Sequence, residues 1–318
     1  MTYPYYSPAT PLTAPVVLPA SSHQARPTQY LPDQGLVDAI NVALLLGQPL
    51  LVTGEAGTGK TQLAYHLAHY LGLSEPLKFE TKSNSTAKDL FYFYDHLRHF
   101  QAAQTKTGSQ ESRDYLTYNA LGAAILRANP YDKIQHLVND DFVKHDQPTR
   151  SVVLIDEIDK AQRDFPNDIL NEIEGMYFRI PELDNAKVQA ELRPVLVLTS
   201  NSEKHLPAAF LRRCVYYHLP FPDKERLEKI IASRVADLTV GSEFIGSALS
   251  IFQTLRNSNL HKAPATAELL NWIITLQSIY PNVANPLANK AEAMRRSLSA
   301  LIKNEEDRKS VLNMLDKL

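Results

Sequence analysis

Short apolar runs alternate with longer amphipathic stretches over the first two thirds of the chain. The runs are nearly continuous in apolar residues, which is typical of parallel strands covered on both faces. These runs are Leu50–Thr53, Leu77–Thr81, Val152–Ile155, Val195–Thr199 and Val215–Leu219. Stretches with helical spacing lie between and before them, and one begins after Asp33, a predicted cap, and ends at Gly47. The pattern predicts an α/β fold in which helices flank a five-stranded parallel sheet.

The strand pattern stops after Phe221 and Pro222, and the rest of the chain has helical spacing. Four or five helices are predicted there, punctuated by prolines. Their expected ranges are 223–238, 243–256, 266–280, 287–302 and 305–317. We therefore expect three parts: a proline-rich arm over residues 1–27, an α/β domain over 28–220 and an all-helical lid domain over 221–318.

The composition favours an ordinary soluble protein, with 44% hydrophobic and 21% charged residues. The formal charge of −2 shows no basic excess that would mark a nucleic-acid binder, and a local basic patch is the alternative. The first residues lack the basic start of a signal peptide, and no apolar run approaches the roughly 20 residues of a membrane span. The single cysteine, Cys214, excludes a disulfide framework and favours a reducing compartment. Together these features predict a cytoplasmic protein without membrane insertion.

One octapeptide fits the pattern G-x-x-x-x-G-K-[ST] in full, directly after an apolar run and before a helical stretch. Its residues are Gly54, Glu55, Ala56, Gly57, Thr58, Gly59, Lys60 and Thr61, and Gln62 follows in the helix. Glycines allow successive backbone N–H groups to turn toward an anion, and a helix N-terminus adds partial positive charge. Lys60 is expected to reach the outer phosphates of a nucleotide and Thr61 to ligate Mg²⁺.

A pair of adjacent carboxylates, Asp156 and Glu157, follows the apolar run in "SVVLIDEIDKA". Packing does not explain them, because burial of charge is costly without a metal or a donor. Asp156 is expected to hold Mg²⁺ through water, and Glu157 to deprotonate an attacking water, which favours hydrolysis. Asn201 ends the next run, "RPVLVLTSN", either as a strand-to-loop turn residue or as an amide that orients that water. Arg212 and Arg213 precede the last run, either as surface charge or as a cation that reaches a neighbouring subunit's phosphate.

The order GEAGTGKT, VVLIDEIDKA, VLTSN and LPAAFLRRC, followed by a helical domain, resembles that of the AAA+ ATPases. The stretches "YNALGAAILRAN" and "FPNDILNEIEGMYFRIPEL" resemble the MoxR-like branch, and the likeness covers about residues 28–280. The resemblance implies that Lys60 and Thr61 belong to Walker A and that Asp156 and Glu157 form Walker B. It also implies that Asn201 is sensor 1 and that Arg212 or, preferably, Arg213 is the arginine finger.

The same resemblance implies ATP and Mg²⁺ as cofactors and a ring, commonly of six subunits, with ATP between neighbours. One departure concerns the sensor 2 arginine, because Ala265 or Thr266 stands at its place in "HKAPATAELLNWI". Lys262 is a candidate substitute that would contact nucleotide, although it lacks the planar fork of arginine. An ordinary exposed lysine is the alternative.

Residues 82–120 form a segment with fewer clear signals. Ser85 or Thr86 is expected to cap a helix whose aromatic run, Leu90–Tyr94, packs in the core, with gripping of a polypeptide as the alternative. The polar stretch that follows is expected to be a loop, which in the family would be an insert facing the pore. Two histidine pairs, His66 with His69 and His96 with His99, are expected on solvated helix faces rather than in a zinc site.

The resemblance favours a chaperone-like ATPase that remodels a protein partner, often one with a von Willebrand factor A domain. A motor subunit of a nucleic-acid or defence complex is the first alternative, and the low charge argues against it. A slow nucleotide-gated switch is the second, and the absent sensor 2 arginine favours it.

Overall fold

A computed structural model describes residues 27–105, 109, 111–202, 206–234 and 241–315. The contacts divide the chain into two compact units. The α/β unit holds the described residues of 27–54 and 59–219, and the helical unit holds residues 55–58 and those from 220 onward. Each unit is described by itself, and the predicted arm over residues 1–27 lies almost wholly outside the described residues.

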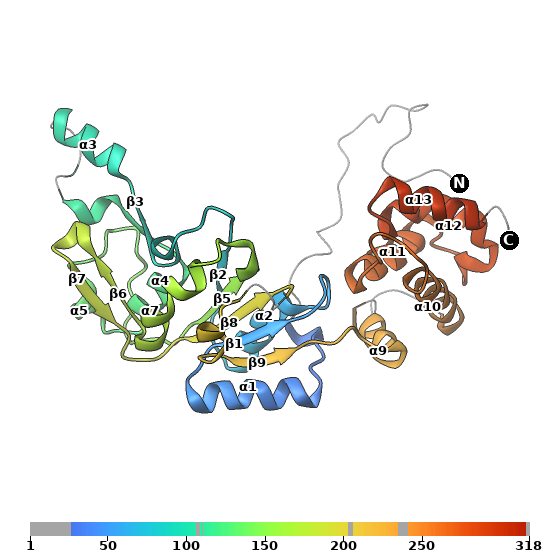
Figure 1. Cartoon of the computed structure of the whole chain (residues 1–318), viewed down its shortest axis with the longest axis horizontal. Coiled ribbons are helices and arrows are strands. Elements are labelled where there is room, and N and C mark those ends of the chain that lie inside the picture. The colour runs from blue at the N-terminus through green and yellow to red at the C-terminus, as the bar shows by residue number, and fades with distance from the viewer. Residues whose placement is uncertain (1–26, 106–108, 110, 203–205, 235–240, 316–318) are drawn as a thin grey trace. The chain divides into compact units, whose positions relative to one another are not determined.

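The α/β unit is built on a five-stranded parallel sheet with the order β2-β5-β8-β1-β9 (Figure 1). The strands are β1 (Leu50–Thr53), β2 (Leu77–Glu80), β5 (Val152–Asp156), β8 (Val195–Ser200) and β9 (Val215–His218). The predicted runs and the fold class are confirmed. Strands β1 and β5 are buried throughout, which explains why their sequences are apolar without alternation.

Helices cover both faces of this sheet. On one face, α1 (Gln34–Leu46) and α2 (Lys60–Tyr70) pack their apolar stripes on alternate residues of the central strands, including Val52 and Leu154. The intervening residues, such as Leu51 and Ile155, belong to a second core shared with α4 (Ala120–Arg127) and α7 (Leu170–Gly175). Because strand side chains alternate between faces, one continuous apolar run serves both cores.

The first helix begins and ends at the residues predicted from the sequence. The Asp33 carboxylate accepts a hydrogen bond from the Leu36 N–H at 2.8 Å, which satisfies a free donor of the first turn. Gly47 closes the helix with φ of 61°, a left-handed conformation that glycine adopts at little cost.

Two antiparallel hairpins are not predicted from the sequence. One pairs β3 (Tyr92–Tyr94) with β4 (Leu116–Tyr118), and the other pairs β6 (Tyr177–Ile180) with β7 (Ala186–Gln189). The expected helix through Leu90–Tyr94 is therefore wrong: Thr86 caps only a short 3-10 turn, and the aromatic run continues as a strand, which suits aromatic side chains.

The polar stretch after that strand is partly helical rather than a loop, because α3 (His96–Thr105) extends into it. The other short helices of the unit are α5 (Tyr131–Ile134), α6 (Phe165–Asp168) and α8 (Ala208–Leu211). Single 3-10 turns occupy Pro27–Gln29, Ala87–Leu90, Ser112–Tyr115, Ile158–Lys160 and Pro181–Leu183.

The helical unit contains the elements expected after the last strand. They are α9 (Lys224–Arg234), α10 (Ser242–Arg256), α11 (Thr266–Ile279), a 3-10 turn at Pro286–Asn289, α12 (Lys290–Leu301) and α13 (Glu305–Leu315). Trp272 of α11 is fully buried, and its indole N–H donates to the Ser297 hydroxyl of α12 at 2.8 Å. None of the described helices is long and apolar enough to cross a membrane.

A buried carboxylate, Asp307 of α13, holds the segment that leads into α11. It accepts hydrogen bonds from the backbone N–H groups of His261 and Lys262 at 2.8 and 3.0 Å and from the Asn304 amide. Burial alone would raise the pKa of this carboxyl, but the hydrogen bonds to its charged form prevail and lower the pKa to about 2.

We predict that Asp307→Asn destabilises the helical unit by about 2 kcal/mol at neutral pH, because the pKa is lowered from 3.8 in the unfolded chain to about 2. The stabilisation by the charged Asp307 is complete above the pKa of the unfolded chain and is lost as the pH falls through the pKa of the folded chain. The difference in free energy of unfolding between wild type and variant should therefore shrink between pH 4 and pH 2. Fluorescence of Trp272, the single tryptophan, would follow urea unfolding of this unit. Glu306→Gln, at an exposed neighbour, is the control. A loss of stability in Asp307→Asn that does not depend on pH would contradict the role given to the charged carboxylate.

Candidate functional site

The carboxyl edge of the sheet gathers the polar residues singled out in the sequence. Strands β1, β5 and β8 are parallel neighbours, so their carboxyl ends meet at one edge. Gly54 follows β1, Asp156 ends β5 and Asn201 follows β8. Residues from three distant parts of the chain are thus brought together.

The loop after β1 has the backbone that an anion cradle requires. Gly54, Gly57 and Gly59 have φ of 148°, 78° and 98°, a region in which other residues would be strained. Helix α2 begins at Lys60, so the N–H groups of its first turn lack acceptors within the helix. Gln62 lies in this turn with its side-chain oxygen buried.

Lys60 joins the loop to the neighbouring strand. Only 7% of the residue is exposed. Its ammonium donates to the Gly54 carbonyl at 2.7 Å and to the Asn201 side-chain oxygen at 3.1 Å. The predicted phosphate-binding lysine and the predicted sensor therefore contact each other directly.

Asp156 is the centre of a second group of contacts and is 8% exposed. The Thr61 hydroxyl donates to its Oδ1 at 3.0 Å, and the Thr199 hydroxyl donates to the same atom at 2.7 Å. Thr61 and Asp156, the two predicted metal ligands, are therefore already adjacent.

Thr199 of β8 is a site residue that the sequence pattern does not reveal. Besides its bond to Asp156, its hydroxyl oxygen accepts the Glu157 N–H at 2.8 Å. Glu157 has φ of 56° and ψ of 51°, a left-handed conformation that is uncommon for a residue with a side chain. Thr199 thus fixes the backbone that presents the predicted base. A threonine inside an apolar strand is too common to mark a site by itself.

The side chain of Glu157 is partly exposed. Its carboxylate pairs with the Lys160 ammonium, and the hydrogen bond and charge of Glu157 raise the pKa of that lysine. The neighbouring Asp159 accepts the backbone N–H of Asn201 at 3.2 Å. Asp159 and Lys160 therefore both contact residues of the site.

The donor set suits a magnesium nucleotide. Mg²⁺ prefers hard oxygen ligands, and the Thr61 hydroxyl and Asp156 carboxylate are such ligands within hydrogen-bonding distance of each other. The glycine-rich loop and the buried Lys60 suit a chain of phosphates. The residues present therefore fit both groups.

The middle of the loop, residues 55–58, groups with the helical unit. Glu55 forms an ion pair at 2.9 Å with Arg256, which the sequence reading did not single out. The Arg256 guanidinium also lies over the Phe221 ring at 3.5 Å and donates to the Pro264 carbonyl at 2.7 Å. Within the loop, the Thr58 hydroxyl donates to the Glu55 carbonyl. Ala56 and Gly57 lie between these two residues.

The predicted sensor 2 positions lie at the start of α11. Ala265 is its N-cap residue and Thr266 its first residue, which is buried. Lys262 is exposed, and its backbone N–H is the donor to Asp307. Its nucleotide contact stays a prediction.

Arg212 and Arg213 lie at the edge of the sheet where the strands begin, opposite to the carboxyl edge. They directly precede β9, whose first residue pairs with Leu50 at the start of β1. A strand rises about 3.3 Å per residue, so the strand places them roughly 13 Å from the carboxyl edge. The structure therefore does not bring them to the site of their own chain.

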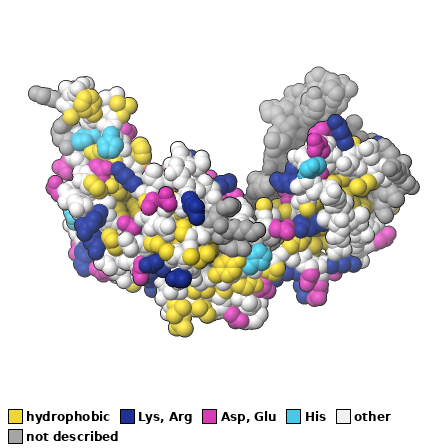
Figure 2. Space-filling model, viewed as in Figure 1, with side chains coloured by type: hydrophobic (Ala, Val, Ile, Leu, Met, Phe, Trp, Pro, Cys, Tyr) yellow, Lys and Arg dark blue, Asp and Glu magenta, His cyan; other side chains and the backbone are white. Residues whose placement is uncertain are grey.

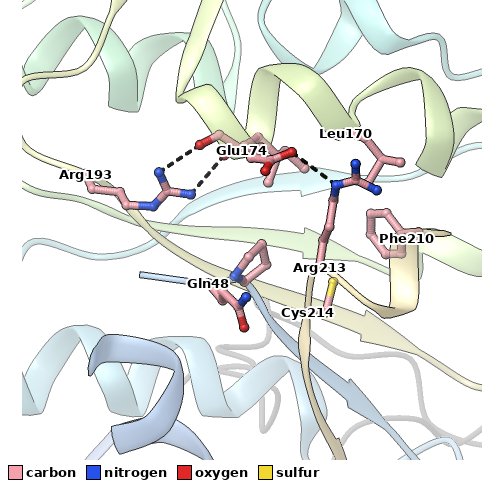
Figure 3. A pocket seen from close by; sticks show the side chains of 9 residues that line it. Gln48, Leu170, Glu174, Arg193, Phe210, Arg213 and Cys214 are labelled. Carbon is pink, nitrogen blue, oxygen red and sulfur yellow. Dashed lines mark hydrogen bonds and ion pairs between the residues drawn. The ribbon is translucent and has the colours of Figure 1, made fainter. Parts of the chain in front are cut away.

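Arg213 borders a small pocket, shown in Figure 3, where two arginines approach Glu174 from opposite sides. The Arg213 Nε is 3.1 Å from the Glu174 carboxylate, in an exposed pair. Arg193 instead binds the backbone carbonyls of Gly47, Ile173 and Glu174. These contacts join the end of α1 to the end of α7.

Cys214 also lines the pocket and packs against the adjoining core. Burial raises the pKa of its thiol to about 12. This agrees with a core residue at the start of a strand, and the thiol is not activated.

One histidine of each pair, His66 and His99, is less exposed than expected, whereas His69 and His96 are exposed. His66 is buried in α2, its Nδ1 lies 2.9 Å from the Pro27 carbonyl oxygen, and its ring packs beside Tyr30. His99 of α3 contacts the Tyr94 hydroxyl at 2.6 Å. Among the described residues no three or more His, Cys, Asp or Glu side chains come together in a group that could hold a metal.

Comparison with known proteins identifies the family of the α/β unit. Residues 49–214 match the model of the AAA domain, dynein-related subfamily. No curated protein matches the sequence. A mutant of RuvB from Thermotoga maritima is 16% identical, covering 90% of this chain and 77% of its own, with a TM-score of 0.50. A second RuvB mutant is 15% identical over 86% of this chain and 72% of its own, with a TM-score of 0.49.

We predict that Thr199→Val lowers the free energy of unfolding by about 1–3 kcal/mol, because the buried Glu157 N–H loses its acceptor and Asp156 a donor. Thr199→Ser keeps the hydroxyl and should lose only about 1 kcal/mol for the missing methyl group. Urea unfolding followed by circular dichroism compares the two variants. Equal stability of the valine and serine variants would show that the hydroxyl does not support the site.

Proposed function

Because the chain belongs to the dynein-related subfamily of AAA domains, we propose that it is a ring-forming, Mg²⁺-dependent ATPase of the MoxR-like type. The observation that carries the proposal is the meeting of Lys60, Asn201, Thr61 and Asp156 at one edge of the sheet. In this proposal ATP hydrolysis changes the arrangement of subunits and remodels or activates a protein partner.

Each residue of the site has a role that its position supports. The loop amides and Lys60 would bind the phosphates, with Lys60 leaving the Gly54 carbonyl for the nucleotide. Thr61 and Asp156 would hold Mg²⁺, which when bound neutralises phosphate charge. Asn201, now held by Lys60 and Asp159, would orient the attacking water.

Glu157 would be the general base. Its backbone is fixed by Thr199, whereas its side chain is 40% exposed and pairs with Lys160. A partly exposed carboxylate next to the site can take a proton from water once phosphate is in place. The left-handed backbone at Glu157 is the kind of strain that concentrates at functional positions.

The arginine positions support catalysis between subunits. Arg212 and Arg213 lie at the edge of the sheet away from their own phosphate loop, so a contact with phosphate requires a second copy of the chain. Helix α1 also exposes Val42, Leu45 and Leu46, and Figure 2 shows hydrophobic side chains gathered there. An apolar patch of this kind suits a subunit interface.

A protein client is supported by a second exposed apolar group. Phe93 of β3 and Leu97 and Phe100 of α3 are each more than half exposed. These side chains suit an apolar polypeptide segment, in line with the gripping role considered for the aromatic run. A partner with a von Willebrand factor A domain is the client class that we propose from the MoxR-like resemblance.

A slow nucleotide-gated switch is the second candidate. The observation that favours it is Ala265, which has no cation to offer at the predicted sensor 2 position. Prompt loss of ATP in a single-turnover assay of the assembled protein would favour the ATPase over the switch.

We predict that Lys60→Ala abolishes ATP binding, because the buried ammonium would be the principal cation for the outer phosphates. Glu157→Gln should bind ATP normally and hydrolyse it roughly 100-fold or more slowly, since it loses only the base. Calorimetric titration and phosphate release measure the two effects. Lys133→Ala, which breaks an exposed pair with Glu191, is the control. Micromolar affinity of Lys60→Ala for ATP would contradict the loop assignment.

Mixing of variants tests catalysis between subunits. Arg213→Ala should lose roughly 1,000-fold in turnover, and Arg212→Ala should lose less. A mixture of Arg213→Ala and Glu157→Gln subunits should regain activity, because one supplies an intact base and the other an intact arginine. A mixture no more active than either variant would count against the shared site.

A further inference from the structure

Lys78 of β2 contacts Asp156, the carboxylate that would bind the metal. Strand β2 lies beside β5 on the side opposite to β8 and β1. In the sheet register Lys78 lies beside Leu154, and Glu80 lies beside Asp156. Alternation along each strand places Lys78, Glu80 and Asp156 on one face. The Lys78 ammonium is 3.2 Å from Oδ2 of Asp156 and 2.6 Å from Oε1 of Glu80.

The two oxygens of Asp156 have different partners. Oδ1 accepts the short hydrogen bond from Thr199 and the bond from Thr61, whereas Oδ2 faces Lys78 and, at 3.3 Å, the Thr61 hydroxyl. The Asp156 side chain is only 10% exposed, so its charge is costly without compensation. The ammonium of Lys78 supplies an opposite charge at this carboxylate.

A lysine on an edge strand has an ordinary explanation, because such residues discourage pairing with another sheet. That role requires an ammonium directed into solvent. Lys78 instead turns along its own strand toward the carboxyl edge, and its side chain is 30% exposed. Both nearby carboxylates raise the pKa of this lysine, in spite of the opposing effect of burial, so it remains charged there.

We propose that Lys78 is a resident counter-ion of Asp156, which it holds in place while no metal is bound and yields when Mg²⁺ binds. This inference rests on the proposed function, since it requires that Asp156 ligates the metal. Mg²⁺ and the ammonium repel each other, so they compete for the same carboxylate. Glu80, 70% exposed in its side chain and already in contact, is the second partner to which Lys78 moves. Lys78 and Glu80 thereby set the Mg²⁺ concentration at which nucleotide binds.

The test is a Mg²⁺ titration of the binding of a fluorescent ADP to the full chain. Lys78→Met should lower the half-saturating Mg²⁺ concentration by roughly tenfold, because the competing charge is gone. Glu80→Gln should raise it, because Lys78 then has only Asp156 as a charged partner. Lys133→Met, at an exposed paired lysine elsewhere in the unit, should leave it unchanged.

Thermal unfolding without metal or nucleotide gives a readout independent of binding. Lys78→Met should melt at a lower temperature than wild type, because Asp156 loses its counter-ion, and Lys78→Arg should stay close to wild type. If Lys78→Met keeps the wild-type Mg²⁺ requirement, or needs more Mg²⁺, the counter-ion role is overturned while the proposed function stands. If the wild-type chain shows no Mg²⁺-dependent binding of nucleotide, the proposed function fails as well.

Discussion

The constraint on which the site depends is the near-complete burial of one carboxylate, Asp156, at the end of a central strand. A charge in that position requires partners, and Thr61, Thr199 and Lys78 provide them from three other elements. These contacts tie the start of α2 to strands β2, β5 and β8. The side chains that would bind phosphate and metal are thereby held next to one another, and the partly exposed Glu157 projects from a backbone that Thr199 holds.

Much of the fold follows from the sequence because its signals are local. Continuous apolar runs mark buried parallel strands, and Asp33 and Gly47 mark the ends of a helix by their capping chemistry. The two hairpins are missed because their strands are short: the run Leu90–Tyr94 fits a buried helix as well as a strand, and pairing with Leu116–Tyr118 decides between them. Secondary structure there is settled by contacts distant in sequence.

The site is predictable to a similar extent. Lys60, Thr61, Asp156 and Asn201 belong to motifs with fixed spacing, and they meet as parallel strand topology requires. Thr199, Lys78 and Arg256 could not be assigned, since threonine in a strand, lysine at an edge and arginine at a helix end are common. Their importance comes from sheet register and from contacts between elements, which composition does not record. The arginines before β9 show the converse, because their motif is recognisable while the register of β9 places them away from the phosphate loop of their own chain.

Titration of the wild-type chain with ATP in a calorimeter, with and without Mg²⁺, tests the central claim most directly. The account predicts saturable binding at one site per chain and tighter binding when Mg²⁺ is present, because the buried carboxylate and hydroxyl would ligate the ion. Absence of binding heat, or equal affinity with and without Mg²⁺, would contradict it.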